Sequence, residues 1–188
     1  MARKVALAVA VFAGMLLSAC AVPGDYRPEL YPEKVYQAYT LGAGDRLRVI
    51  VFGQDALSNT YTVDGLGRIS LPLIGSVRVQ GLHAGAVERL IASKLRNGYI
   101  RDPHVAVEVE AFRPFFILGE VTNAGQYPFV DSMTVRTAIA IAGGFSPRGF
   151  DDGADLTRVI DGYPVTGRVP LDFPVRPGDT ITVLERIF

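Results

Sequence analysis

Two histidines and a cluster of aspartates are the residues whose types and spacing most readily suggest chemistry. His83 and His104, the two histidines of the chain, fall at an expected helix start and on the polar side of an expected strand. A catalytic or zinc pair needs a third partner and convergent geometry, so we interpret both as partly exposed side chains. Asp151, Asp152 and Asp155 form a D-D-G-x-D pattern. Calcium ligation remains an alternative there, but the distal Glu of an EF-hand loop is missing, and we interpret the three as solvated loop carboxylates.

The sequence contains no motif of the common nucleotide-dependent or acyl-transfer enzymes. It has no serine nucleophile elbow and no phosphate-binding G-x-x-x-x-G-K. Gly65-Leu66-Gly67 precedes an expected strand, whereas a dinucleotide-binding fingerprint opens a helix. A spatial pair of carboxylates for glycosidase chemistry remains open, because such a pairing is not visible in the spacing. We predict that the protein is not an enzyme and that it holds no cofactor and no metal.

The composition is that of a globular protein with one domain or two small ones. The 188 residues are 49% hydrophobic and 20% charged, and 19 basic side chains balance 19 acidic ones. A neutral chain has no bulk attraction for nucleic acid or anionic lipid, so we expect no nucleic-acid partner. Tryptophan is absent, which excludes a sugar-binding platform lined by Trp.

The single cysteine, Cys20, lies where an N-terminal targeting segment ends. A basic segment precedes an apolar run over residues 5–17, which is shorter than the ~20 residues of a membrane-spanning helix. Leu17-Ser18-Ala19-Cys20 resembles the lipobox of bacterial lipoproteins. The resemblance implies removal of a signal peptide (1–19) and acylation of Cys20, whose acyl chains anchor the mature protein. An ordinary signal peptide with an incidental cysteine, or a short membrane anchor, remains an alternative.

The residues after Cys20 indicate where the protein is sorted. Residue 21 is Ala, whereas Asp at this position is the usual inner-membrane retention signal in enterobacteria. The lipobox resemblance therefore implies an outer-membrane location, lipid-anchored and facing the periplasm. Residues 20–38 contain three prolines and three tyrosines without a clear period, and we interpret them as a lipidated N-terminus and tether. A strand-like arm packed on a neighbour is the alternative.

The stretch from Val63 to Leu95 organises the rest of the chain. It opens with Asp64-Gly65, which predicts the positive φ angles of a tight hairpin turn. Apolar residues alternate from Ile69 to Leu73, the period of a half-buried strand that Gly75 interrupts before it resumes. The apolar period then becomes that of a helix, which Asn97-Gly98 ends with a left-handed cap.

This stretch resembles the periplasmic export domain of Wza-type polysaccharide export proteins. The resemblance rests on D-G-x-G-x-I-x-L-P-L-I-G-x-V-x-V-x-G-L, followed by a helix and then by D-P-x-V-x-V. It covers about Tyr39 to Phe112, and we place an export domain at 39–113. His83 stands where the family usually has a Thr or Ser that caps the helix, so the capping of this helix is left open.

Two turns that end in Gly-Asp and lead into strands form a weak internal repeat. The first contains Gly44 and Asp45, and the second contains Gly178 and Asp179. The glycines supply a permissive backbone, and we expect the aspartate side chains to accept hydrogen bonds from neighbouring amides.

The C-terminal part resembles a second module, the SLBB domain, which has a ubiquitin-like β-grasp fold. The segments G-E-V-x-N-A-G-x-Y and T-V-x-x-A-I-A-x-A-G-G carry this resemblance, and we place the domain at 114–188. A strand is expected at Tyr127–Val130, and a helix at 133–142 that begins at a cap formed by Asp131 or Ser132. The predicted fold class is therefore α+β, with two small mixed domains: an export domain (hairpin-strand-helix-strand) and a β-grasp-like SLBB domain.

The two resemblances together imply a role in polysaccharide export. They imply an outer-membrane-anchored periplasmic subunit of a capsular or exopolysaccharide export channel, a homo-oligomeric ring that conducts the polymer without catalysis. The implied partners are the polysaccharide chain and an inner-membrane polysaccharide co-polymerase, a tyrosine-kinase-like chain-length regulator. The sequence ends at Phe188 after the last expected strand, and we expect a short lipoprotein form without the family's C-terminal outer-membrane helix.

One alternative comes from another class, a monomeric periplasmic lipoprotein that binds a small soluble sugar or cofactor through its SLBB domain. A deep pocket with aromatic lining would mark such a binder. For the ring, the candidate lumen or interface residues are those that project from the polar faces of expected strands. They are Arg46, Arg48, Arg68, Arg78, Glu108 and Glu110.

Overall fold

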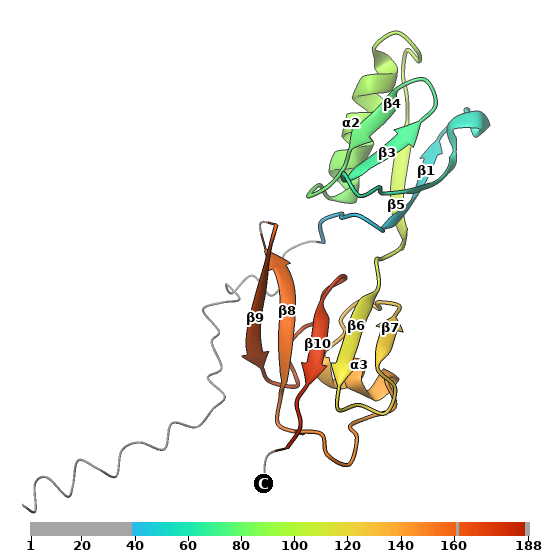
Figure 1. Cartoon of the computed structure of the whole chain (residues 1–188). Coiled ribbons are helices and arrows are strands. Elements are labelled where there is room, and N and C mark those ends of the chain that lie inside the picture. The colour runs from blue at the N-terminus through green and yellow to red at the C-terminus, as the bar shows by residue number, and fades with distance from the viewer. Residues whose placement is uncertain (1–38, 161, 187–188) are drawn as a thin grey trace, which may run out of the picture.

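The computed structural model describes residues 39–160 and 162–186, which form two packed bodies joined through Arg113 (Figure 1). We call them the N-terminal body (residues 39–112) and the C-terminal body (residues 114–186). Both combine one α-helix with strands, so the predicted α+β class is confirmed. The predictions on the signal peptide, Cys20 and the tether concern residues outside the described ranges.

The N-terminal body is built on a three-stranded antiparallel sheet. Its central strand β1 (Arg46–Val51) pairs with β2 (Asn59–Thr62) on one side and with β5 (Val105–Ala111) on the other. The 3-10 helix η3 (Asp55–Leu57) connects β1 to β2. Side chains along β1 alternate between exposed and buried, so one face of this sheet belongs to the core and the other is open.

A hairpin and one helix complete this body. The hairpin consists of β3 (Arg68–Leu71) and β4 (Gly75–Arg78), and the helix α2 (Ala84–Arg96) connects it to β5. The apolar stripe of α2 packs against the inward side chains of the sheet and the hairpin. The buried residues of this core are Leu41, Leu47, Val49, Val51, Leu57, Val63, Ile69, Leu71, Val77, Val79, Val87, Ile91, Leu95 and Val107.

The turn at residues 64–67 differs from its prediction. The Asp64 carboxylate closes it by accepting backbone N–H bonds from Leu66 and Arg68, each at 2.9 Å. The positive φ lies at Gly67 (73°) rather than at Gly65. The strands on either side, β2 and β3, belong to different sheets, so the prediction of a hairpin at Asp64-Gly65 is wrong.

The hairpin instead reverses just before Gly75. Leu73 (φ 67°) and Gly75 (φ 66°) adopt left-handed conformations there, and the chain folds back so that Ile69 lies opposite Val77. The alternation in the sequence predicts one interrupted strand over β3 and β4, and this prediction is wrong. A period of two continues on both sides of the reversal, so alternation alone does not reveal it.

The two ends of α2 are held differently. His83 occupies the N-cap position but its side chain makes no capping bond; its ring Nδ1 lies 2.8 Å from the backbone oxygen of Tyr39 instead. At the other end Gly98 has φ 98°, and the amides of Tyr99 and Ile100 donate to the carbonyl of Leu95. The predicted left-handed C-cap is confirmed.

The C-terminal body contains a five-stranded mixed sheet in the order β7-β6-β10-β8-β9. The central strands β6 (Phe115–Gly119) and β10 (Thr180–Val183) are parallel, and the other neighbours are antiparallel. The parallel pairing of the first and last strands at the centre of the sheet is the arrangement of a β-grasp fold. The outer strands are β7 (Gly125–Tyr127), β8 (Ala154–Ile160) and β9 (Tyr163–Val169).

One face of this sheet is covered by the short helix α3 (Val135–Ile141) (Figure 1). Thr134 caps it and forms a capping box with Thr137, so the predicted cap at Asp131 or Ser132 is wrong. Ser132 has φ 61°, outside the extended region that an N-cap residue needs. The buried core beneath α3 contains Phe115, Ile117, Val121, Met133, Val135, Ala138, Ile139, Ala142, Ala154, Leu156, Val169, Leu171, Val175, Ile181 and Val183.

Two parts of the C-terminal sheet differ from what the sequence predicts. β7 ends at Tyr127, where the sequence predicts that a strand begins. The strands β8 and β9 were not assigned at all. In β8 the third inward position is Arg158, which is buried, and a charged residue there interrupts the apolar alternation by which a strand is recognised.

Candidate functional site

Four of the six candidate lumen or interface residues come together on the open face of the three-stranded sheet. Arg46 and Arg48 project from β1, and Glu108 and Glu110 project from β5; all four are exposed. Arg48 lies directly opposite Glu108 in the ladder, and Arg46 Nη2 is 3.0 Å from Glu110 Oε2. This face is therefore a charged strip in which arginines and glutamates neutralise one another.

The other two candidates, Arg68 and Arg78, lie on the hairpin. They are direct cross-strand partners and both are exposed. Among the described residues no carboxylate forms an ion pair with either of them. Unlike the sheet, this surface is positively charged and has no acid partner in the part of the chain that the structure describes.

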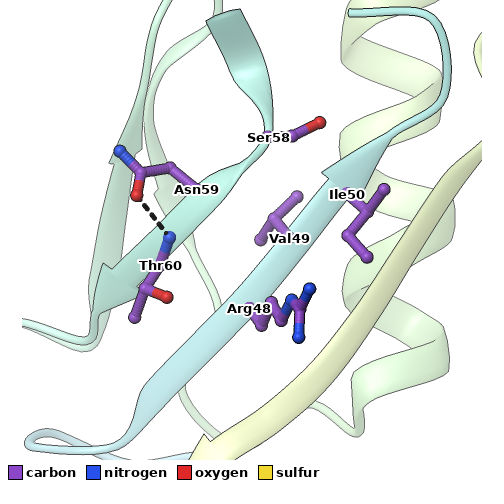
Figure 2. Close-up of a pocket in the computed structure, with 6 residues that line it drawn as sticks. All are labelled: Arg48, Val49, Ile50, Ser58, Asn59 and Thr60. Carbon is purple, nitrogen blue, oxygen red and sulfur yellow. Dashed lines mark hydrogen bonds between the residues drawn. The ribbon is translucent and has the colours of Figure 1, made fainter. Parts of the chain in front are cut away.

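A hollow of about 170 Å³ opens between β1 and β2. Figure 2 shows Arg48 on β1 beside Asn59 and Thr60 on β2, where the Asn59 side-chain oxygen accepts the Thr60 amide at 2.8 Å. Pockets for small ligands usually enclose roughly 300–1,000 Å³ and have apolar or aromatic linings. This hollow is smaller, has no aromatic lining and lies outside the C-terminal body. It does not match the pocket that a sugar-binding SLBB domain would need. Its full lining is Arg48, Val49, Ile50, Ser58, Asn59 and Thr60.

The histidines and the aspartate cluster are not brought into one site. His104 is exposed and lies 3.4 Å from the Asp102 carboxylate, on the loop that precedes β5. Two of the three clustered aspartates have arginine partners: Asp155 Oδ1 is 2.6 Å from Arg168 Nε, and Asp151 pairs with Arg186 at 3.2 Å. In the described ranges no set of three His, Cys, Asp or Glu side chains has metal-binding geometry. Within the same ranges, no helix has the length and apolar character needed to cross a bilayer.

The residues with the densest polar contacts lie at the junction of the two bodies, around Asp45. The Asp45 side chain is fully buried and accepts hydrogen bonds from the amides of Gly42 (2.7 Å) and Arg113 (2.8 Å). The Tyr39 hydroxyl donates to it at 2.5 Å, and Arg113 Nη1 lies 3.2 Å away. A buried carboxylate is stable only when its charge is paired and hydrogen-bonded, and here both conditions are met.

The second Gly-Asp turn repeats this construction in the C-terminal body. Asp179 is buried and accepts the amide of Arg176 at 2.7 Å, as Asp45 accepts that of Gly42 three residues earlier. Arg158 binds it with two parallel bonds, Nε to Oδ1 at 2.9 Å and Nη2 to Oδ2 at 2.7 Å. The expectation that both aspartates bond neighbouring amides is confirmed. Their arginine partners were missed, because each partner is distant in sequence.

Arg113 lies between the two turns. A Cβ added at Gly42 would approach its Nη1 to 2.4 Å, and one added at Gly178 would approach its Nε to 2.8 Å. Both glycines therefore allow close approach of the guanidinium. The amide of Gly178 also donates to the carbonyl of Pro114 at 3.0 Å. The arginine thus contacts a turn from each body and fixes their relative placement.

Three aromatic rings continue the contact across the junction. Tyr39 meets Phe112 edge to face with centroids 4.8 Å apart, and Phe112 meets Phe129 in the same way at 5.5 Å. Burial raises the pKa of Tyr39, and its hydrogen bond to Asp45 raises it further, whereas Arg113 opposes the rise. Tyr39 therefore keeps its proton and acts as a donor to Asp45.

The fold is that of an α+β protein made of two small modules with polar strand faces, joined at an ion pair whose aspartate is buried. Comparison with known families specifies the class further. The family described as polysaccharide biosynthesis/export protein matches residues 33–110, and the SLBB domain matches residues 114–169. The two parts of the chain thus match, in order, the two domains expected of Wza-type polysaccharide export proteins, as the sequence motifs indicate.

Two relatives agree with this assignment. The exopolysaccharide production protein ExoF of Rhizobium meliloti is 33% identical over 132 residues, which are 64% of this chain and 31% of ExoF. The polysialic acid transport protein KpsD of Escherichia coli is 30% identical over 111 residues, which are 58% of this chain and 20% of KpsD. The aligned region is therefore less than a third of either relative.

Proposed function

We propose that this protein is an outer-membrane-anchored, periplasmic subunit of a capsular or exopolysaccharide export channel. Acylation of Cys20 anchors it, and copies of the chain assemble into a ring through which the polymer passes. The observation that carries the proposal is the succession of an export domain and an SLBB domain in one chain. The names of ExoF and KpsD, which refer to exopolysaccharide production and polysialic acid transport, support a polysaccharide as the cargo.

The junction supports a ring with two layers. A closed ring needs the same contact between each pair of neighbours, so both domains of every subunit must keep one relative orientation. The contacts of Arg113 with Asp45 and with the Gly178 turn restrict that orientation. If the two domains of a subunit could rotate freely relative to each other, the ring of one domain could close while the copies of the other domain stayed unaligned.

Conduction through such a ring needs no catalytic group. A hydroxyl-rich chain passes a polar, hydrated lumen through weak contacts at many positions, whereas tight binding would stall it. We place the lumen or the subunit interfaces at the polar strand faces that carry Arg46, Arg48, Glu108 and Glu110 on the sheet, with Arg68 and Arg78 on the hairpin. The energy comes from the inner-membrane partner, a tyrosine-kinase-like polysaccharide co-polymerase.

The test is surface polysaccharide in a strain that lacks this gene, complemented with the wild type or with Cys20→Ser. Loss of surface polymer, restored by the wild type and restored less by the unanchored variant, is the expected result. Unchanged secretion in a strain without a redundant paralogue would contradict the export role. Full rescue by Cys20→Ser would contradict the role of the anchor.

A second measurement separates the ring from a monomeric binder. Native mass spectrometry of the detergent-extracted protein should give a closed oligomer with one dominant subunit number. A monomer at micromolar concentration, together with saturable binding of a small sugar, would contradict the ring.

A further inference from the structure

The outer face of the β3–β4 hairpin presents two matched rows of polar side chains. Arg68 lies directly opposite Arg78, and Ser70 lies directly opposite Ser76. All four side chains are exposed, because they alternate with the buried residues of β3 and β4. Figure 1 shows the hairpin lying against α2, and within the described residues no other element covers the face away from α2.

The arginine row is unfavourable for the isolated chain. Like charges directly opposite one another destabilise an antiparallel pair. Other arginines of the chain have carboxylate partners, such as Arg46 with Glu110 and Arg168 with Asp155. The carboxylate nearest to this row in sequence, that of Asp64, is occupied by the backbone amides of the adjoining turn.

We propose that this hairpin face binds the carboxylate groups of an acidic polysaccharide. The inference rests on the export function proposed above and specifies the class of polymer. Two arginines directly opposite one another on paired strands offer forked donors that match a carboxylate, and the serine hydroxyls donate to or accept from sugar hydroxyls. The bound anion relieves the repulsion between Arg68 and Arg78. Because the site is exposed, solvent and salt weaken each contact, which suits a polymer that must move on.

The test compares binding of an acidic and a neutral sugar chain to the full-length protein carrying Cys20→Ser, which removes the acyl group. The probes are oligogalacturonate, dextran of similar length, and vesicles of phosphatidylglycerol. The variant is Arg68→Gln with Arg78→Gln. Its control is Arg89→Gln with Arg96→Gln, two exposed arginines on α2 whose removal changes the net charge by the same amount.

The wild type should bind oligogalacturonate but not dextran, and binding should weaken as salt is added. The hairpin variant should bind oligogalacturonate about tenfold more weakly, since two charge-assisted contacts are lost, while the α2 variant stays within about twofold. Replacement of both hairpin arginines by Lys should give intermediate binding, because the charge remains but the fork is lost.

Equal binding by the hairpin variant and the wild type would overturn the inference. Equal losses in both double variants would assign the effect to bulk charge and overturn it as well. If the hairpin arginines are needed for vesicle binding and the protein does not bind oligogalacturonate, the ligand of this face is an anionic membrane and not an acidic polymer. If the gene deletion abolishes export but the purified protein ignores oligogalacturonate, only this inference fails. If deletion leaves export unchanged, the proposed function fails.

Discussion

Asp45 and Arg113 form an ion pair that connects the turn before the first strand of the export domain to the residue that joins the two domains. Arg113 Nη1 lies 3.2 Å from Asp45 Oδ2, and the Arg113 amide donates to the other carboxylate oxygen at 2.8 Å. The aspartate is fully buried and the arginine is 29% exposed. The pair therefore joins an aspartate carboxylate that solvent does not reach to an arginine side chain that is partly exposed at the junction.

A double-mutant cycle with Asp45→Asn and Arg113→Gln measures this pair. Asp45→Asn should lower the free energy of unfolding by about 3 kcal/mol, because it breaks a buried charged network. The coupling between the two substitutions should lie at about 1–3 kcal/mol, as for residues in one hydrogen-bonded network. Urea denaturation of the Cys20→Ser protein gives these values.

The matched control is the exposed pair of Arg46 and Glu110, at 3.0 Å and with side chains 54% and 38% exposed. Its coupling should be below about 1 kcal/mol, because solvent screens exposed pairs. An equal or larger coupling there would mean that burial does not strengthen the junction pair.

Gly178→Ala tests the close approach of Arg113 to the second turn. Gly178 has φ 88°, and an added Cβ would lie 2.8 Å from Arg113 Nε. Gly144 has nearly the same φ, 85°, but nothing within 4 Å of its added Cβ. Both substitutions to Ala should cost about 1 kcal/mol for the left-handed backbone, and Gly178→Ala should cost about 1–3 kcal/mol more from overpacking.

Combination with Arg113→Ala should remove most of that additional loss, because the side chain that the new methyl group meets is gone. If Gly178→Ala and Gly144→Ala have equal effects in thermal unfolding, Arg113 does not restrict the turn.

The raised pKa of Tyr39 predicts a loss of stability at alkaline pH. The folded state keeps the Tyr39 proton above pH ~10, where a tyrosine in the unfolded chain loses it. The unfolded state then binds fewer protons, so the free energy of unfolding falls with pH, by at most about 1.4 kcal/mol per unit. The contribution is complete below pH ~10 and diminishes above it.

Tyr39→Phe lacks the phenol and serves as the control. It should be less stable than the wild type near pH 8 by about 1 kcal/mol, since its hydrogen bonds are lost, and this gap should narrow above pH 10. Denaturant curves of both proteins at pH 8 and pH 11 measure the gap. A constant gap would show that Tyr39 titrates as it does in the unfolded chain.

Asp179→Asn should be the most damaging conservative change in the SLBB domain. The side chains of Asp179 and Arg158 are 2% and 9% exposed, and removing one charge leaves the other buried at a cost of about 3 kcal/mol. Asp155→Asn affects a more open pair, 31% exposed at Asp155 and 19% at Arg168, and should cost about 1 kcal/mol or less. Thermal unfolding compares the two, and a larger effect at Asp155 would contradict the role assigned to burial.

Local patterns in the sequence predicted much of the architecture. The helical stripe of α2 and its left-handed end at Gly98, the strand after each Gly-Asp turn, and the amide bonds of Asp45 and Asp179 all depend on residues a few positions apart. The family resemblance depends on the same short segments. Such features follow from local backbone preferences and from hydrophobic period, which the sequence displays directly.

The tertiary structure alone decided which distant residues meet. The reversal before Gly75 leaves the alternation of apolar residues unchanged. The sequence therefore does not reveal the pairing between β3 and β4, which only the structure shows. In the sequence, Arg158 interrupts the apolar alternation of β8, and only the structure shows that Asp179 neutralises its charge. Arg113 carries no local motif, yet it contacts turns separated by more than a hundred positions in the chain. Ion pairs and close approaches of this kind depend on the packing of whole elements, and no local period records them.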